Sequence, residues 1–264
     1  MSESRLERAW AALRHEGRTA LIPYLTAGHP DLERSAEMLR IADETCDILE
    51  VGVPFSDPLA DGPVIQRSTF EALNRGMTLA RTLALVDRVS PRQPVVIFSY
   101  LNPILQYGVD RFLADADQLG IAGILLTDLP AGGDPALEGA VRSSPLDLIR
   151  LVAPTTTPAR LAEIADGAQG FLYLVARLGV TGASRELAAD LGRQVERVRA
   201  ASPLPVAVGF GISTADQAGA VARMADGVVV GSALVDTLDR TGVTGAAALL
   251  ASLRQALDQG VVAR

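Results

Sequence analysis

The sequence predicts a closed (β/α)₈ barrel with an extra N-terminal helix, formed by residues 1–264 as a single domain. Two observations indicate this fold. Eight short, apolar, β-rich segments alternate with amphipathic helical segments at a mean spacing of roughly thirty residues, and such alternation is typical of parallel sheets. No Ser/Gly-rich linker or shift in composition divides the chain.

A helix is expected before the first strand. Ser4-Arg5-Leu6-Glu7 has the spacing of a capping box, in which the Ser and Glu side chains each accept a hydrogen bond from the other residue's backbone N–H. Leu6, Trp10 and Leu13 follow at helical spacing. The helix should therefore extend to about His15.

Strands and helices are then expected to alternate along the chain. The predicted strands are Leu21–Leu25, Cys46–Val51, Pro94–Ser99, Gly123–Thr127, Leu148–Val152, Phe171–Val175, Pro205–Gly209 and Gly227–Val230, and the helical stretches between them include Asp31–Glu44, Leu79–Arg88, Pro158–Ala165, Arg185–Ala200 and Thr214–Met224. An open, doubly wound sheet is the alternative. It would normally need a G-x-G-x-x-G turn after its first strand, and Thr26-Ala27-Gly28-His29-Pro30 does not match that pattern.

The composition excludes several kinds of chemistry. All 24 basic residues are Arg, so the chain can form no lysine Schiff base, no lysine-bound pyridoxal phosphate and no Walker P-loop. With only His15, His29 and Cys46 available, a three-histidine metal centre, a Cys-rich zinc site and an internal disulfide are excluded, and we expect no metal. We expect Cys46 in the core and His29 in a solvated loop.

Charge and hydropathy bear on partners and location. The net charge is −7, and acidic and basic residues are interspersed, so no basic face is offered to nucleic acid. The polar start and the lack of any apolar run approaching ~20 residues argue against a signal peptide and a membrane span. A cytoplasmic protein without a membrane partner is expected.

Glu50 is the first candidate for chemistry. In the second predicted strand, alternation puts Leu49 and Val51 on the helix-facing side and Glu50 toward the barrel interior, near its mouth. A carboxylate there is costly to ionise, so its pKa should rise, which suits a general acid/base. The alternative is a structural Glu that an Arg or backbone donors satisfy.

The loops after the strands hold further candidates. Asp57 and Asp61 lie four residues apart in a Pro/Gly-rich loop, where one could supply a second carboxylate over the mouth or simply stabilise a turn. Asp128, after the fourth strand, could anchor its loop. The segment 177–184 has the length and glycines of a mobile lid, or is an inert loop. Tyr173 either lines the pocket or belongs to the core.

Two glycine turns suggest a phosphate site. The seventh strand leads into Gly209-Phe210-Gly211-Ile212-Ser213 and the eighth into Gly231-Ser232-Ala233. Glycines let backbone N–H groups approach an anion, and loops after strands seven and eight are the usual phosphate site of this barrel. The alternative is that the glycines only permit tight turns.

Taken together, these segments resemble the tryptophan synthase α chain family over nearly the whole chain. The resemblance is strongest at residues 49–63, LEVGVPFSDPLADGP, and extends to residues 25–28, 179–183, 209–213 and 231–233. It implies a (β/α)₈ barrel that cleaves indole-3-glycerol phosphate to indole and glyceraldehyde 3-phosphate, a retro-aldol step without a cofactor. Glu50 would be the acid/base, and Asp61 would accept the indole N–H.

The resemblance also implies a substrate pocket and a partner. The pocket would comprise Tyr24, Phe98, Tyr100, Leu125, Thr127, Leu151, Tyr173 and Phe210 around the indole, backbone N–H groups of Gly182, Gly211, Gly231 and Ser232 around the phosphate, and Thr181 closing over the site. Indole would pass to a pyridoxal-phosphate β chain in an αββα heterotetramer. Pro54, Asp57, Pro58, Asn102 and Pro130 would lie on that interface.

Some positions depart from the usual family pattern. Thr127 brings a hydroxyl to a position that is often apolar, Ala176 and Leu178 differ beside the expected lid, and Ala131-Gly132-Gly133 replaces a more acidic stretch near the partner surface. The alternatives are a stand-alone lyase, a non-catalytic chain that only activates the β chain, and a different phosphosugar barrel such as an isomerase. Retention of both Glu50 and Asp61 argues against the last two.

Overall fold

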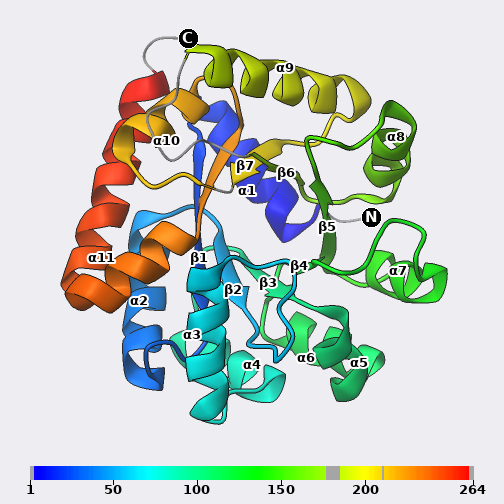
Figure 1. Ribbon diagram of the computed structural model, residues 1–264. Helices are drawn as coiled ribbons and strands as arrows, with labels where there is room; N and C mark the ends of the chain where they lie inside the picture. Colours follow the sequence, from blue (N-terminus) through cyan, green and yellow to red (C-terminus); the bar gives the residue numbers. More distant parts are fainter. Residues whose placement is uncertain (1–2, 177–184, 210, 262–264) are drawn as a thin grey trace.

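The computed structural model describes residues 3–176, 185–209 and 211–261. Eight parallel strands close into a barrel in chain order, with β8 pairing to β1, and helices surround them (Figure 1). The predicted (β/α)₈ barrel is therefore confirmed. Within the described ranges, no helix combines the length and apolar character needed to cross a bilayer.

Along the chain, each strand is followed by one or two helices. The strands are β1 Ala20–Thr26, β2 Leu49–Gly52, β3 Val95–Ser99, β4 Gly123–Leu126, β5 Asp147–Val152, β6 Leu172–Val175, β7 Val206–Gly209 and β8 Gly227–Val230. The helices are α1 Arg5–His15, α2 Leu32–Thr45, α3 Pro63–Asn74, α4 Leu79–Val89, α5 Leu101–Tyr107, α6 Val109–Gln118, α7 Pro135–Arg142, α8 Pro158–Gly167, α9 Arg185–Ala201, α10 Ala215–Ala222 and α11 Ser232–Val261.

The extra helix α1 has the predicted capping box and ends at the predicted residue. The Ser4 hydroxyl accepts from the Glu7 backbone N–H at 3.0 Å, and the Glu7 carboxylate accepts from the Ser4 backbone N–H. The Ser4 hydroxyl also donates to Asp147 at the start of β5, at 2.6 Å. Trp10 is buried against Phe171, with ring centroids 5.6 Å apart. These contacts attach α1 to the end of the barrel where the strands begin.

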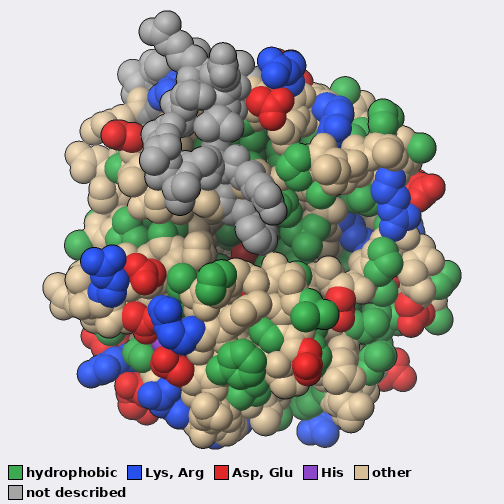
Figure 2. All heavy atoms as spheres, in the orientation of Figure 1, with side chains coloured by type: hydrophobic (Ala, Val, Ile, Leu, Met, Phe, Trp, Pro, Cys, Tyr) green, Lys and Arg blue, Asp and Glu red, His purple; other side chains and the backbone are tan. Residues whose placement is uncertain are grey.

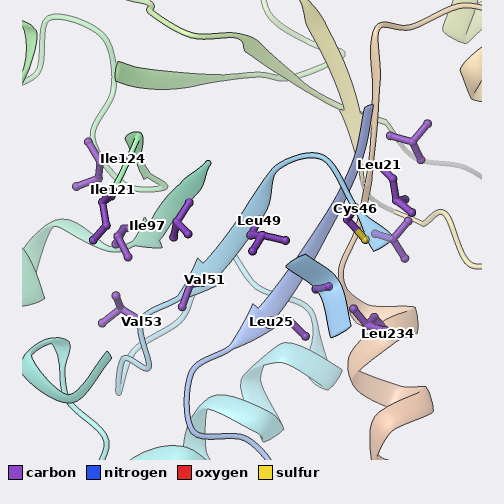
Figure 3. Close-up of a cluster of buried hydrophobic side chains, with 14 of the residues drawn as sticks. Leu21, Leu25, Cys46, Leu49, Val51, Val53, Ile97, Ile121, Ile124 and Leu234 are labelled. Carbon is purple, nitrogen blue, oxygen red and sulfur yellow. The ribbon is translucent and has the colours of Figure 1, made fainter. Parts of the chain in front are cut away.

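Alternation along the strands separates two apolar clusters. Outward-facing residues such as Leu25, Leu49 and Ile97 belong to one buried cluster between the strands and the helices, and Leu234 of α11 belongs to the same cluster (Figure 3). Inward-facing residues, with Trp10 of α1, form a second cluster inside the barrel. Because successive strand residues point to opposite faces, each strand places every second side chain in the barrel interior.

The structure also tests the predicted environments of Cys46 and His29. Cys46 is buried directly after α2, as predicted, although β2 begins three residues later, at Leu49. The prediction of a solvated His29 is wrong. The ring is buried between α3 and α11, with Nε2 2.7 Å from Asp239 Oδ1 and Nδ1 3.5 Å from Glu71 Oε2. The loop after β1 lies beneath α3 and α11, and the sequence around His29 gives no sign of these two contacts.

Charged side chains are mixed over the visible surface. On the face drawn in Figure 2, Arg side chains lie next to Asp and Glu side chains. Elsewhere in the described chain, ion pairs such as Arg67–Asp239 and Arg88–Glu33 also join side chains of opposite charge. The interspersed charges predicted from the sequence are thus seen on this face.

Candidate active site

A cavity opens at the carboxyl ends of the strands. It is lined by Tyr24, Glu50, Asp61, Gly62, Ile65, Phe98, Tyr173, Gly211, Ile212, Val229, Gly231 and Ser232. The cavity therefore brings together both candidate carboxylates, three predicted aromatic residues and both glycine turns. Catalytic residues of this fold belong at this end of the barrel.

Glu50 points into the barrel from β2, as alternation predicted. Its register partners are Tyr24 on β1 and Val96 on β3, and its side chain is 0% exposed. Neither carboxylate oxygen has a hydrogen-bond partner among the described residues. The alternative interpretation, in which an Arg or backbone donors pair with Glu50, therefore finds no support in the described part of the chain. Burial raises the pKa of Glu50 to about 8, which keeps the group mostly protonated at neutral pH.

Asp61 faces the same cavity from the loop between β2 and α3. The Tyr100 hydroxyl donates to Asp61 Oδ2 at 3.1 Å and accepts from the Ala60 backbone N–H at 2.9 Å. Burial raises the pKa of Asp61 to about 6, and the hydrogen bond from Tyr100 opposes that rise. Asp61 is therefore mostly ionised at neutral pH, in contrast to Glu50.

Two glycines make room for the tyrosines of the cavity. A Cβ at Gly52 would lie 2.1 Å from the Tyr24 hydroxyl, and one at Gly209 would lie 2.2 Å from the Tyr173 hydroxyl. Any other residue at these positions would displace the rings. Tyr24 also packs edge-on against Phe98, with centroids 5.2 Å apart, which gives the cavity an aromatic wall.

The glycine turns meet the cavity as the phosphate prediction requires. Gly211 has φ +90°, a conformation that favours glycine. Helix α11 begins at Ser232, and the Gly231 carbonyl accepts from Leu234 and Val235 N–H. The backbone N–H groups of a helix's first turn lack intrahelical acceptors and attract anions. Gly211, Gly231 and Ser232 thus form a candidate anion site on the wall of the cavity.

The remaining predicted pocket residues divide into three groups. Leu125 and Leu151 pack in or against the cluster inside the barrel but do not line the cavity, and Tyr100 reaches it only through Asp61. The Thr127 hydroxyl donates to the Ser99 carbonyl at 3.4 Å. Thr181, Gly182 and Phe210, with the expected lid and its departure at Leu178, lie outside the described residues.

Sequence reasoning missed four residues of the lining, namely Gly62, Ile65, Ile212 and Val229. Alternation along β8 could have found Val229, since it shares a face with Gly231. Gly62 and Ile212 are direct neighbours of residues that were predicted. No sequence pattern indicated that Ile65 would line the cavity, because its position depends on how α3 packs against the barrel.

The loops beside the cavity hold the predicted partner residues. Asp57, Asn102 and Pro130 are exposed, whereas Pro54 and Pro58 are buried within the chain and present little surface. Leu59, in the same loop as Asp57, is 92% exposed. Asp128 accepts from the Leu101 N–H at 2.7 Å, as expected of a loop anchor.

Comparisons with known proteins agree on one family. Residues 10–260 match the family described as "Tryptophan synthase alpha chain". Similar curated proteins include tryptophan synthase alpha chains of Acidiphilium cryptum, 48% identical over 89% of this chain and 87% of that protein, and of Citrifermentans bemidjiense, 45% identical over 98% of both.

Solved structures give the same result. A chain of Mycobacterium tuberculosis tryptophan synthase is 41% identical with a TM-score of 0.89, covering 97% of this chain and 99% of that one. Tryptophan synthase subunit alpha from Legionella pneumophila is 34% identical with a TM-score of 0.89, covering 98% and 100%. Both the sequence and the barrel are thus shared over nearly their full length.

Proposed function

The chain belongs to the tryptophan synthase alpha chain family, and from that premise we propose a role for each residue of the cavity. The chain is the lyase subunit that cleaves indole-3-glycerol phosphate to indole and glyceraldehyde 3-phosphate. The observation that supports the residue assignment most strongly is Glu50, a fully buried carboxyl group without a hydrogen-bond partner among the described residues, in the wall of the cavity.

Glu50 first acts as a general acid. Its raised pKa of about 8 keeps a proton available at neutral pH, and this proton is transferred to C3 of the indole ring. Protonation at C3 leaves a positive charge centred on the ring nitrogen. Ionised Asp61 accepts a hydrogen bond from that N–H and stabilises the charge.

Glu50, now a carboxylate, then acts as a general base. It takes the proton from the hydroxyl on the carbon attached to C3 as the carbon–carbon bond breaks. The bonding electrons return to the ring and restore neutral indole, while the hydroxyl carbon becomes the aldehyde. The protonated ring is the electron sink, so we propose that this subunit needs no cofactor and no lysine.

The walls of the cavity orient the substrate. Tyr24, Phe98 and Tyr173 suit a flat apolar ring, and the first turn of α11 with Gly211 suits the phosphate. With the indole ring against the aromatic residues and the phosphate at the first turn of α11, the carbon–carbon bond that breaks lies beside Glu50. Leu125 and Leu151 support this wall from inside the barrel. Tyr100 borders it through its hydrogen bond to Asp61, and we assign Thr127, directly after β4, to the same border.

We also propose that the chain binds a tryptophan synthase beta chain, which carries the pyridoxal phosphate, in an αββα heterotetramer. Exposed Asp57, Asn102 and Pro130, together with Leu59, supply surface beside the cavity. The buried Pro54 and Pro58 shape the loop that presents it. Indole released at the mouth is then next to the partner.

The acid/base role is tested with Glu50→Gln, which keeps the shape of the side chain but cannot exchange a proton in this range. We expect turnover to fall about 10²–10⁴-fold while substrate binding is largely kept. Glu37→Gln, at an exposed position of α2, is the matched control and should keep full activity. Loss of less than tenfold in Glu50→Gln would contradict the assignment.

The partner is tested by measuring indole release by the purified chain, alone and with a beta chain from the same source. Slow release that rises on adding the partner supports the complex. Rapid release that ignores the partner identifies a stand-alone lyase. Stimulation of the partner without any indole release would identify a non-catalytic activator.

A further inference from the structure

The loop between β2 and α3 carries Asp61, yet side-chain packing does little to fix it. Residues 56–63 are exposed apart from Pro58 and Asp61, and the largest apolar side chain among them, Leu59, is 92% exposed. A segment with few buried apolar contacts opens easily. An anion stabilises the ring nitrogen only when it is held at hydrogen-bond distance. The position of Asp61 therefore depends on hydrogen bonds.

Hydrogen bonds reach Asp61 at its carboxylate and at both of its main-chain groups. The Tyr100 hydroxyl donates to the carboxylate, and the Asp61 N–H donates to the Pro58 carbonyl at 3.1 Å, which closes a turn over residues 58–61. The Asp61 carbonyl accepts from the side-chain Nε2 of Gln66 at 3.0 Å, and it accepts from no other group in the described part of the chain. Gln66 thus fixes the backbone of Asp61, whereas Tyr100 fixes its carboxylate.

The Gln66 amide bonds both ends of this turn. Its Nε2 also donates to the Pro58 carbonyl, at 3.3 Å. Both neighbours are carbonyl acceptors, so the nitrogen of the amide, and not its oxygen, must face them. An amide nitrogen carries two N–H groups, and these two carbonyls use both. Loss of the side chain would therefore release the first and last residues of the turn together.

Gln66 stands on a helix that is itself fixed to the barrel. Its backbone N–H donates to the Gly62 carbonyl at 3.0 Å, close to the start of α3. Before it, Ile65 is buried in the cavity wall, and after it, Ser68 is buried with its Oγ 2.8 Å from Thr26 Oγ1 at the end of β1. The side chain thus joins an exposed loop to a part of the barrel with a defined position.

We propose that Gln66 is a positioning residue for the lyase reaction, which holds the backbone of Asp61 so that the carboxylate meets the indole N–H. This role rests on the proposed function of Asp61. Gln66 does not line the cavity, so its effect on the reaction passes through Asp61. A glutamine that only stabilised the fold would instead act independently of Asp61, and the two cases can be separated by experiment.

Gln66→Met tests the role, because methionine is unbranched and of similar length but has no N–H donor. In the full chain, kcat/KM for indole release should fall about tenfold or more, since a displacement of about 1 Å at a reacting group can cost about a hundredfold. The circular dichroism spectrum should stay that of the wild type. Gln194→Met is the matched control: Gln194 is a half-buried glutamine of α9, away from the cavity, whose Nε2 donates to Asp190 at 2.6 Å. It should keep the activity of the wild type.

Gln66→Glu is a second variant, which keeps the size and polarity of the side chain. Its carboxylate can donate to neither carbonyl, so kcat/KM should fall at least as far as in Gln66→Met. This variant keeps the test valid if methionine disturbs folding.

A double-mutant cycle with Asp61→Asn separates positioning from stability. In the Asp61→Asn background, Gln66→Met should lower kcat/KM by no more than about threefold, because the anion that Gln66 positions is already gone. Single turnovers with enzyme in excess make the slow variants measurable.

Each contrary result has a distinct meaning. Wild-type kcat/KM in Gln66→Met or Gln66→Glu would overturn the proposal. An equal fold loss from Gln66→Met in both backgrounds would also overturn it, because Gln66 would then act independently of Asp61. Wild-type activity in Asp61→Asn alone would contradict the proposed function of Asp61 and, with it, this role of Gln66.

Discussion

Replacing Tyr100 by Phe should move the acidic limb of the pH–rate profile. The Tyr100 hydroxyl donates to Asp61 Oδ2 at 3.1 Å, and this bond lowers the pKa of Asp61 against the effect of burial, leaving it at about 6. Without the hydroxyl, burial acts unopposed and the pKa rises. A hydrogen bond to a charged group contributes about 1.5–3 kcal/mol, so a shift of roughly one pKa unit or more is expected.

The consequence depends on pH in a defined direction. The proposed reaction needs Asp61 ionised and Glu50 protonated, so kcat/KM should be bell-shaped, falling below about 6 and above about 8. With the pKa of Asp61 near 7, its ionised fraction at neutral pH falls from about nine-tenths to about half. Tyr100→Phe should therefore lose most activity on the acidic side and recover part of it as pH rises.

The assay is kcat/KM for indole release across the pH range, for wild type, Tyr100→Phe and a matched control. Tyr107→Phe is that control, because the Tyr107 hydroxyl also donates to a carboxylate, Asp115, but away from the cavity. It should leave the profile unchanged. An acidic limb in Tyr100→Phe that coincides with that of the wild type would refute the reasoning.

Three further predictions concern the same cavity. Gly52→Ala puts a Cβ 2.1 Å from the Tyr24 hydroxyl, so the Tyr24 ring must move. Turnover should fall by at least about tenfold, while the circular dichroism spectrum stays unchanged. Turnover equal to that of the wild type would show that the position of the ring is unimportant. Gly211→Asp should raise KM for the phosphorylated substrate by about tenfold or more through like-charge repulsion, whereas an unchanged KM would place the phosphate elsewhere. Glu50→Gln should stabilise the fold at pH 7–8 by about 4 kcal/mol. The folded state holds the Glu50 proton up to about pH 8, whereas the unfolded chain releases it above about pH 4.3, so the stability of the wild type falls as the pH rises between these values. Urea unfolding of the wild type and of Glu50→Gln at pH 4 and pH 7.5 measures the difference in their free energies of unfolding. A difference of the same size at both pH values would contradict the prediction.

Sequence patterns predicted those features that depend on regular geometry. Period-two alternation put Glu50 inside the barrel, and the capping box placed the start of α1. Glycines after β7 and β8 indicated the anion site because this fold brings those two loops together. Each of these inferences needed only one element and the known symmetry of the barrel.

Features that depend on docking between distant segments were not predictable. His29 was misjudged because Glu71 and Asp239, which surround it, lie on α3 and α11, far along the chain. Ile65 reaches the cavity only through the way α3 packs. A cavity lined by Trp10 and Leu204 forms where α1 meets the segment before β7, and neither segment alone indicates it.

The hydrogen bond from Tyr100 belongs to this second group, yet the proposed chemistry depends on it. Both reacting groups are carboxyl groups in one apolar cavity, and burial alone would push both pKa values upward. Two protonated carboxyl groups could supply a proton but could not stabilise the positive ring nitrogen. The pKa of Asp61 rises less for two reasons: Asp61 is less completely buried than Glu50, and it stands on a loop within reach of the Tyr100 hydroxyl. Glu50 is fully buried on a strand, with no donor beside it among the described residues. The difference between a loop and a strand position thus separates the two pKa values, and this separation lets one carboxyl group act as the acid and the other as the anion at the same pH.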